Sequence, residues 1–293
     1  MIAQPNSSML SKRTEPHLVH DLSWFFLFLV GYTALSFWGL SASGNYYVYM
    51  FAYMWSPALA ALSVCVMTRS GVCRLRLSSW GSFRTLLLSM VIPFIYGMVS
   101  YAVIWAAGWG IFNLEQLELT VKKMGLASWP LPVAAALYVV MMGLQGTLGN
   151  MPSSLGEELG WRGFLAPRLR TQLSFPVTAI VVGLVWGIWH FPLILKNADA
   201  SPLVPIAVTL FLFTLFTIAA SFLFNWLSDR EGSVWPAVVL HSAHNCFILG
   251  LFERMTKSTP TSEWYTGESG LVLWLAILLT TIFVRALSRR TAK

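Results

Sequence analysis

Two adjacent carboxylates lie in a segment that mixes charged and apolar residues, residues 152–167. Glu157 and Glu158 are followed by Arg162, which comes four residues after Glu158. On a helix, an acid that precedes a base by four residues favours an ion pair. Glu157 then lies on a neighbouring face and is free for another task.

These residues alone leave two interpretations of the segment open. It is too polar to cross a membrane by itself and too apolar for a simple loop. One interpretation is a partly embedded helix that Ser153 or Ser154 could cap, with the carboxylates in its first turn, where the helix dipole favours anions. The other is a cytoplasmic helix whose charges are solvated.

Histidines occur inside or at the edge of long apolar runs. His190 ends one run, and His241 lies in another, followed by His244 and Asn245. Ionisable groups within the membrane are unfavourable by about 2.5–3.5 kcal/mol on insertion scales, so they usually face a protein interior or a water cavity and carry function. A single histidine could instead be a packing residue bonded to a carbonyl. Both Asn245 and His244 lie within reach of the helix face of His241, and spacing does not choose between them.

A carboxylate and two imidazoles that converge in a low-dielectric cavity can activate a water molecule and stabilise the oxyanion of peptide hydrolysis. Glu157, His190 and His241 are the candidates for this chemistry. The same groups could hold a divalent metal such as zinc through His190, His241 and a carboxylate. The chain has no H-E-x-x-H motif, and only two clear protein ligands remain if Glu157 is the base. This favours a hydrolase without a metal.

The composition is that of a protein solvated by lipid. Of 293 residues, 56% are hydrophobic and 11% charged, with a mean hydropathy of +0.66, whereas soluble domains carry about 25% charged residues. The net charge of +7 does not indicate nucleic acid, because the cations are scattered between apolar runs. Cys65, Cys73 and Cys246 have no C-x-x-C spacing, and the chain has no G-x-S-x-G motif, so neither a thiolate zinc site nor a serine nucleophile is indicated.

Apolar runs long enough to cross a bilayer as helices predict an all-α, polytopic transmembrane bundle of about eight spans. The runs are too long for the strands of a membrane barrel. They lie near residues 22–40, 46–68, 85–108, 131–149, 175–195, 203–226, 234–251 and 270–287.

Cations near the ends of these runs indicate orientation. They precede the first run, follow the second, precede the fifth and end the chain, so all four groups fall on one side if eight helices alternate. They are Lys12 and Arg13; Arg69, Arg74, Arg76 and Arg84; Arg162, Arg168 and Arg170; and Arg285, Arg289, Arg290 and Lys293. Lys122 and Lys123 run against the trend. We therefore expect both termini in the cytoplasm.

Helix geometry raises one difficulty. If the fifth and seventh spans run in the same direction, His190 and His241 differ in depth by about 12 Å at 1.5 Å per residue. A tilted fifth span, a deeper start of the seventh span or partial insertion of the Glu157 helix would bring them together.

Three blocks in a fixed order resemble the CAAX protease and bacteriocin-processing family of intramembrane proteases, which is related to the type II CAAX prenyl endopeptidase. The blocks are Gly-Glu-Glu-Leu-Gly-Trp-Arg-Gly-Phe-Leu at residues 156–165, Trp186-x-x-x-His190, and His241-x-x-x-Asn245. The resemblance covers roughly residues 150–250. The earlier spans match only in being hydrophobic.

The resemblance implies a role for each residue of the blocks. Glu157 would be the general base, His190 and His241 would hold the water or oxyanion, and Asn245 would help bind the oxyanion. Glu158 and Arg162 would be supporting neighbours whose ion pair fixes the first helix. Trp186 replaces the phenylalanine that is usual in the family, and we expect this aromatic exchange to matter little.

These observations predict an intramembrane endopeptidase that cleaves a membrane-associated protein or peptide. We divide the chain into a cytoplasmic tail (1–21), N-terminal transmembrane helices (22–149), a catalytic core (150–251), and a last loop, helix and basic tail (252–293). We expect a multi-pass protein of a bacterial cytoplasmic membrane, partnered by the lipid bilayer and not by nucleic acid. The alternatives are a non-catalytic, peptide-binding immunity protein and an ion-coupled transporter, although the chain lacks the repeated halves typical of transporters.

Overall fold

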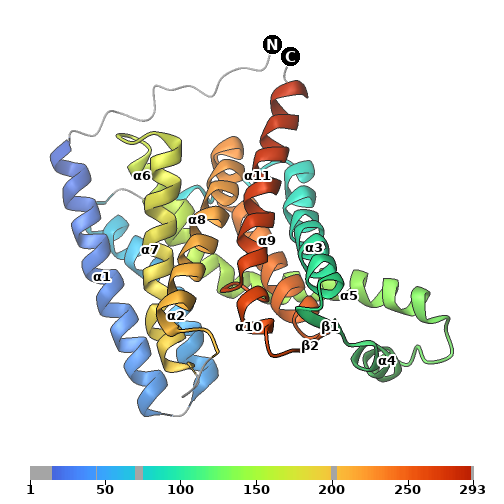
Figure 1. Ribbon diagram of the computed structural model, residues 1–293. Coiled ribbons are helices and arrows are strands. Elements are labelled where there is room, and N and C mark those ends of the chain that lie inside the picture. Colours follow the sequence, from blue (N-terminus) through green and yellow to red (C-terminus); the bar gives the residue numbers. More distant parts are fainter. Residues whose placement is uncertain (1–14, 44, 70–74, 199–202, 292–293) are drawn as a thin grey trace.

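The computed structural model describes residues 15–43, 45–69, 75–198 and 203–291, without the side chains at 15, 16 and 289–291. Within this part of the chain, eight helices are long and apolar enough to cross a membrane. Seven of the spans correspond to α1 (Glu15–Ala42), α2 (Tyr46–Met67), α3 (Phe83–Ala106), α5 (Leu131–Glu158), α7 (Phe175–Lys196), α8 (Ile206–Glu231) and α11 (Leu271–Thr291). The remaining span consists of α9 (Trp235–His244) and the π-helix that continues it to Phe252. The predicted all-α polytopic bundle is confirmed, and the predicted runs match these helices closely (Figure 1).

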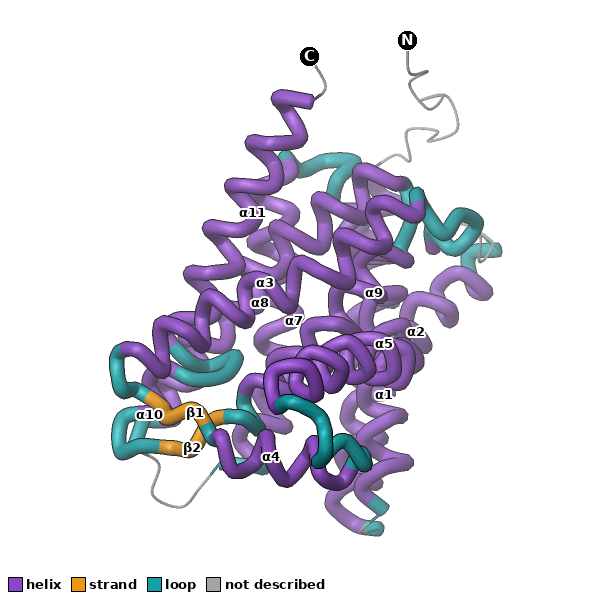
Figure 2. The backbone as a smooth tube through the Cα atoms, turned by 90° about the vertical axis from the view of Figure 1, so that its right-hand side faces the viewer, coloured by secondary structure: helices purple, strands orange, loops and turns teal. Residues whose placement is uncertain are grey.

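Short elements gather at one end of the bundle (Figure 2). Strands β1 (Gly110–Phe112) and β2 (Thr256–Ser258) pair in antiparallel fashion, with Gly110 opposite Ser258. Helices α4 (Leu114–Lys123) and α10 (Ser262–Tyr265) lie at the same end. The pairing joins the loop after α3 to the chain beyond α9, and so helps to fix the loop that leads into α11.

The first turn of α1 and the last turn of α11 both lie at the opposite end of the bundle (Figure 1). Ion pairs join neighbouring loops at this end. Asp229 at the end of α8 binds Arg76 at 2.8 Å and Arg170 at 3.6 Å. Lys12, Arg13, Arg74 and Lys293, used above for orientation, lie outside the described residues, as does Cys73. The arrangement agrees with an even number of crossings, and the side of the membrane stays a prediction.

The carboxylate segment is part of α5 and not a separately capped helix. Helix α5 continues through Pro152 to Glu158, and a π-helix, η3 (Leu159–Leu165), and the short α6 (Ala166–Leu169) follow directly. The expected serine cap is therefore wrong, since Ser154 is buried inside the helix. Backbone groups within a bilayer must be satisfied by the protein, which favours an unbroken helix, and the Trp55 indole N–H donates to the Pro152 carbonyl at 2.9 Å. Figure 1 shows α5 running across the other long helices.

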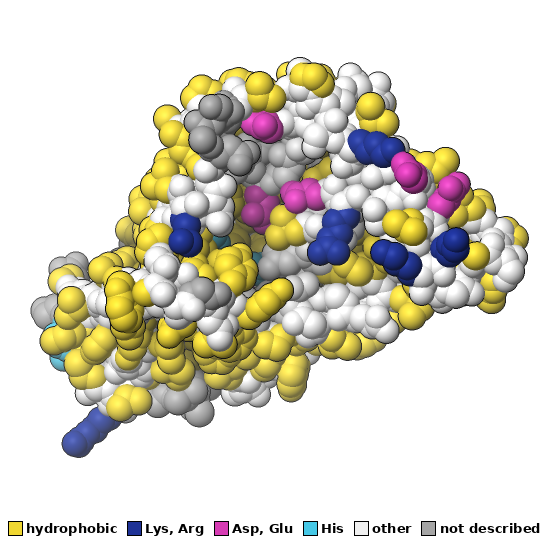
Figure 3. All heavy atoms as spheres, turned by 90° about the horizontal axis from the view of Figure 1, so that it is seen from below, with side chains coloured by type: hydrophobic (Ala, Val, Ile, Leu, Met, Phe, Trp, Pro, Cys, Tyr) yellow, Lys and Arg dark blue, Asp and Glu magenta, His cyan; other side chains and the backbone are white. Residues whose placement is uncertain are grey.

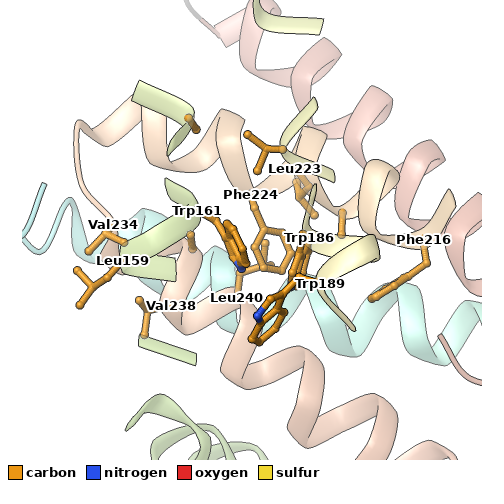
Figure 4. Close-up of a cluster of buried hydrophobic side chains, with 14 of the residues drawn as sticks. Leu159, Trp161, Trp186, Trp189, Phe216, Leu223, Phe224, Val234, Val238 and Leu240 are labelled. Atoms are coloured by element: carbon orange, nitrogen blue, oxygen red, sulfur yellow. The ribbon is translucent and has the colours of Figure 1, made fainter. Parts of the chain in front are cut away.

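Glycines allow helix backbones to approach closely on both sides of the site. A Cβ on Gly160 would lie 2.8 Å from the Pro57 carbonyl oxygen of α2, and one on Gly183 would lie 2.8 Å from the Ile218 nitrogen of α8. Small residues at such crossings are typical of membrane helix packing. They bring η3 against α2 and α7 against α8. Figure 4 shows the buried aromatic cluster between these helices, with Trp186 beside Phe224.

Candidate active site

A buried ion pair joins the end of α5 to helices α8 and α9. Arg162 binds both carboxylate oxygens of Glu158 through Nη1 at 3.0 Å. Its other nitrogens donate to Asn225 Oδ1 at 3.3 Å and to Ser221 Oγ at 3.0 Å. The opposite side of Glu158 accepts from His241, whose Nδ1 lies 2.8 Å from Oε1. The predicted pair of Glu158 and Arg162 is therefore present, and it also orients His241.

These charges are enclosed by protein and not solvated. Glu157 is 3% exposed, and Glu158 and Arg162 are fully buried. The Arg162 guanidinium lies 4.6 Å from the ring centre of Trp186 and 4.7 Å from that of Phe224, and aromatic faces attract a cation. The interpretation as a solvated cytoplasmic helix is wrong, because the long apolar α5 carries the segment into the bundle.

Glu157 occupies a separate face, as the spacing predicts. Its Oε2 accepts a hydrogen bond from Trp186 Nε1 at 2.7 Å, and its Oε1 lies 3.9 Å from His241 Nε2. A separation of 3.9 Å is too long for a direct hydrogen bond but short enough for one water oxygen to lie about 2.8 Å from both atoms. Because His241 Nδ1 donates to Glu158, neutral His241 has an unprotonated Nε2 toward Glu157.

His190 lies one helical turn beyond Trp186. Its Nδ1 donates to the Trp186 carbonyl oxygen at 3.0 Å, since a carbonyl can only accept. The Trp186 ring centre is 5.4 Å from that of His241 and 6.1 Å from that of His190. The Trp186 ring is therefore a neighbour of both histidines.

The structure brings His244, and not Asn245, into a hydrogen-bonded row. His244 is buried, with Nδ1 2.6 Å from the Tyr96 hydroxyl and Nε2 2.9 Å from Glu268 Oε1. Asn245 is the first residue of a π-helix, η4 (Asn245–Phe252), and is partly exposed. Within the described ranges, its side chain is in no hydrogen bond with protein. Adjacent residues on a helix point in different directions, which is why these neighbours face different surroundings.

Sequence reasoning missed three contributors. Tyr96 and Glu268 lie far along the chain from His244, so no local spacing could pair them. Trp186 was noted only as an aromatic replacement, whereas its indole N–H binds Glu157, which phenylalanine could not do. The one available signal was the indole itself, because a tryptophan in an apolar helix needs a partner for its N–H.

A cavity of about 490 Å³ opens beside His190 at the end of the bundle that holds α10. Its lining includes Phe213, Thr209, Glu263 and Glu268. Figure 3 views the molecule from this end and shows acidic side chains set in a hollow with apolar rims. The His190 end of the site therefore borders an open cavity.

Two carboxyls beside the cavity have displaced pKa values. Burial, reinforced by the charge of Glu268, raises the pKa of Glu253 from 4.5 to about 7. Burial would also raise the pKa of Glu268, but the hydrogen bond to His244 and the nearby histidines outweigh it and lower that pKa. Glu268 is therefore ionised at neutral pH, while Glu253 titrates near it.

The described residues do not fit a three-ligand zinc site. No group of three or more His, Cys, Asp and Glu side chains is placed there to hold one ion. Glu157 Oε1 lies 3.9 Å from His241 Nε2, and His241 Nδ1 is already bonded to Glu158. Catalytic zinc normally has three protein ligands, so no step below passes through a metal.

The fold and site together define a polytopic helical membrane protein with a buried carboxylate–imidazole centre. Residues 128–247 match the family model described as type II CAAX prenyl endopeptidase Rce1-like. A stretch of 41 residues is 46% identical to CAAX prenyl protease 2 of Methanococcus maripaludis, covering 14% of this chain and 15% of that protein. The resemblance seen in the sequence is thus confirmed for the segment that carries all three blocks.

Proposed function

We propose that this chain is an intramembrane endopeptidase in which Glu157 activates the attacking water. The observation that carries the proposal is the 3.9 Å gap between Glu157 Oε1 and His241 Nε2. Both residues are held from behind, Glu157 by Trp186 and His241 by Glu158. A water molecule between them would have an acceptor on each side, which is the arrangement that general-base activation needs.

The reaction consumes one water molecule. Glu157 takes a proton from the water as its oxygen bonds to the carbonyl carbon of the scissile peptide. The tetrahedral intermediate then collapses, the C–N bond breaks, and the proton passes from Glu157 to the leaving nitrogen. The products are a carboxylic acid and an amine, which become carboxylate and ammonium once the acid's proton passes to the amine, and Glu157 returns to its starting state.

The negative oxygen of the intermediate needs hydrogen-bond donors. Asn245 has an amide group without a protein partner in the described part of the chain, and His190 borders the cavity. These are the candidates for that role, together with His241 when it is protonated. Glu158 and Arg162 support the site by fixing His241 and the end of α5.

The substrate class follows from where the site lies. Glu157, His190 and His241 are on membrane-spanning helices, so a substrate must itself be associated with the bilayer. The relative's name refers to prenylated CAAX proteins, and a prenylated peptide is the first substrate to test. A lipid-modified or apolar peptide without that motif is the second.

The test uses purified protein in lipid vesicles and an internally quenched peptide that ends in a farnesylated Cys-aliphatic-aliphatic-X sequence, beside the same peptide without the farnesyl group. Mass spectrometry identifies the bond cleaved. We expect cleavage by the parent and none by Glu157→Gln, which keeps the shape but not the basicity of the side chain. A matched control is Glu118→Gln, since Glu118 is exposed on α4, away from the site. Equal cleavage by the parent and Glu157→Gln would refute the proposal.

A further inference from the structure

A carboxylate outside the matched family segment lies against the site. Glu268 is in the loop between α10 and α11, beyond residues 128–247. It accepts from His244 Nε2 at 2.9 Å, and it lines the same cavity as His190. With the hydrogen on Nε2, His244 Nδ1 accepts from the Tyr96 hydroxyl at 2.6 Å. One carboxylate, one imidazole and one phenol therefore form a directed row.

The loop that carries Glu268 is held in one conformation. Tyr265 stacks on Trp109, with ring centres 3.9 Å apart and planes at 8°. The Gly267 N–H donates to the Tyr101 hydroxyl at 3.3 Å. Gly267 has φ +71°, and a Cβ there would lie 2.8 Å from Glu253 Oε1. Only glycine combines this left-handed turn with this close approach, and the turn precedes the residue that faces His244.

The charge of Glu268 acts on every histidine of the site. Its carboxylate interacts electrostatically with His190, His241 and His244, the last being the closest. The other acid beside it, Glu253, has a pKa raised to about 7, so Glu268 supplies the more persistent negative charge. The hydrogen bond to His244 is the contact through which this charge fixes the orientation of a ring.

Aromatic packing connects His244 to the cavity wall. Its ring centre is 5.2 Å from that of Phe216, which is 5.6 Å from that of Phe213, which in turn is 5.0 Å from that of His190. Packed side chains transmit displacement because protein interiors have few voids. A shift of His244 would therefore move the wall against which His190 lies.

We propose that Glu268 is a positioning residue of this site, which holds His244 and, through the Phe216 and Phe213 wall, sets the place of His190 at the mouth of the cavity. The proposal rests on the hydrolase function proposed above. It implies that the chain beyond the family segment is part of the working site. It also explains why His244, at an unspecified position of the third block, has both ring nitrogens bonded.

The first test is a double-mutant cycle on the farnesylated peptide, with Glu268→Gln, His244→Gln and the double variant. Glu268→Gln should lower kcat by about tenfold or more, because small displacements of reacting groups have effects of that order, and should leave KM within about twofold. The double variant should be no worse than the poorer single variant. The matched control is Glu263→Gln, since Glu263 lines the same cavity but accepts from the Leu203 N–H at 3.0 Å. In a double variant, the factor by which Glu263→Gln changes kcat should multiply the factor for His244→Gln.

Parent kcat in Glu268→Gln, or multiplying effects of Glu268→Gln and His244→Gln, would overturn the proposal. Equal cleavage by the parent and Glu157→Gln would instead refute the hydrolase function. A measurement without substrate separates the two: nitrogen NMR of the five histidines after ¹⁵N-histidine labelling, with His244→Gln for assignment. We expect Nε2–H on His244 in the parent, a changed His244 signal in Glu268→Gln and an unchanged one in Glu263→Gln. An unchanged His244 signal in Glu268→Gln overturns the proposal whatever the activity. If Glu268→Gln does not fold, Glu268→Asp withdraws the carboxylate by one methylene and should change the same signal.

Discussion

Trp186→Phe removes a single hydrogen-bond donor from the candidate base. The indole N–H lies 2.7 Å from Glu157 Oε2, and phenylalanine keeps an aromatic ring against Phe224 and Arg162. A hydrogen bond to a charged group contributes about 1.5–3 kcal/mol, and the smaller ring leaves a cavity that is destabilising by on the order of 1 kcal/mol. We therefore expect a loss of about 2–4 kcal/mol in stability.

The effect on catalysis follows from the freedom that Glu157 gains. Its Oε2 loses the one protein donor found for it in the described part of the chain, so the carboxylate can turn away from the water position near His241. Misplacement by about 1 Å can lower a rate about 100-fold, and partial loss of orientation predicts a fall in kcat of about tenfold. Phenylalanine is the residue usual at this position in the resembled family. The variant therefore tests a hydrogen bond that depends on the tryptophan of this chain.

Trp189→Phe is the matched control. Trp189 is also buried, one turn from Trp186, and its indole N–H donates at 3.0 Å to Thr33 Oγ1, a neutral partner. Trp189→Phe loses the same atoms and one hydrogen bond as Trp186→Phe, but that bond is to a neutral partner. The stability of the protein should therefore fall by less in Trp189→Phe than in Trp186→Phe, and so should kcat. The assays are kcat on the farnesylated peptide and thermal unfolding in detergent. Equal kcat and equal melting temperature for the two variants would refute the reasoning.

Four further predictions follow from the same structure. Arg162→Ala leaves Glu158 buried and unpaired, so stability should fall by about 3–5 kcal/mol; full yield and melting temperature with lost activity would place Arg162 in the reaction itself. Glu253 has a folded-state pKa raised from 4.5 to about 7, so its contribution to stability is present below pH 4.5 and lost as pH rises through 7. Between these pH values the free energy of unfolding should fall by up to on the order of 3 kcal/mol in the parent. Glu253→Gln should remove this fall, so its melting temperature should depend less on pH, and an unchanged pH profile would contradict this. Extended chelation should leave cleavage intact; stoichiometric zinc whose removal abolishes activity and whose return restores it would sink the metal-free mechanism. Reporter fusions at Lys293 and in the loop near Ala42 should report opposite sides of the membrane, with Lys293 in the cytoplasm, and a shared side would overturn the eight-span topology.

Hydrophobic run length by itself determined the helices. A bilayer admits only segments that satisfy their own backbone, so apolar runs of about 20 residues give spans with little ambiguity. The i,i+4 spacing likewise determined the pair of Glu158 and Arg162, because neighbours on a helix depend only on local geometry. The separate face of Glu157 follows from the same rule.

Contacts between distant helices were decided only by the tertiary structure. The serine cap failed because the signal at Ser153 and Ser154 is local, whereas the continuation of α5 through Pro152 depends on packing against α2. The partners of His244 could not be read from spacing, because one of them is a carboxylate 24 residues further along the chain. The hydrogen bond from Trp186 to Glu157 required the crossing of α5 and α7. In each case the partner is set by how helices cross, which residue spacing along one helix does not encode.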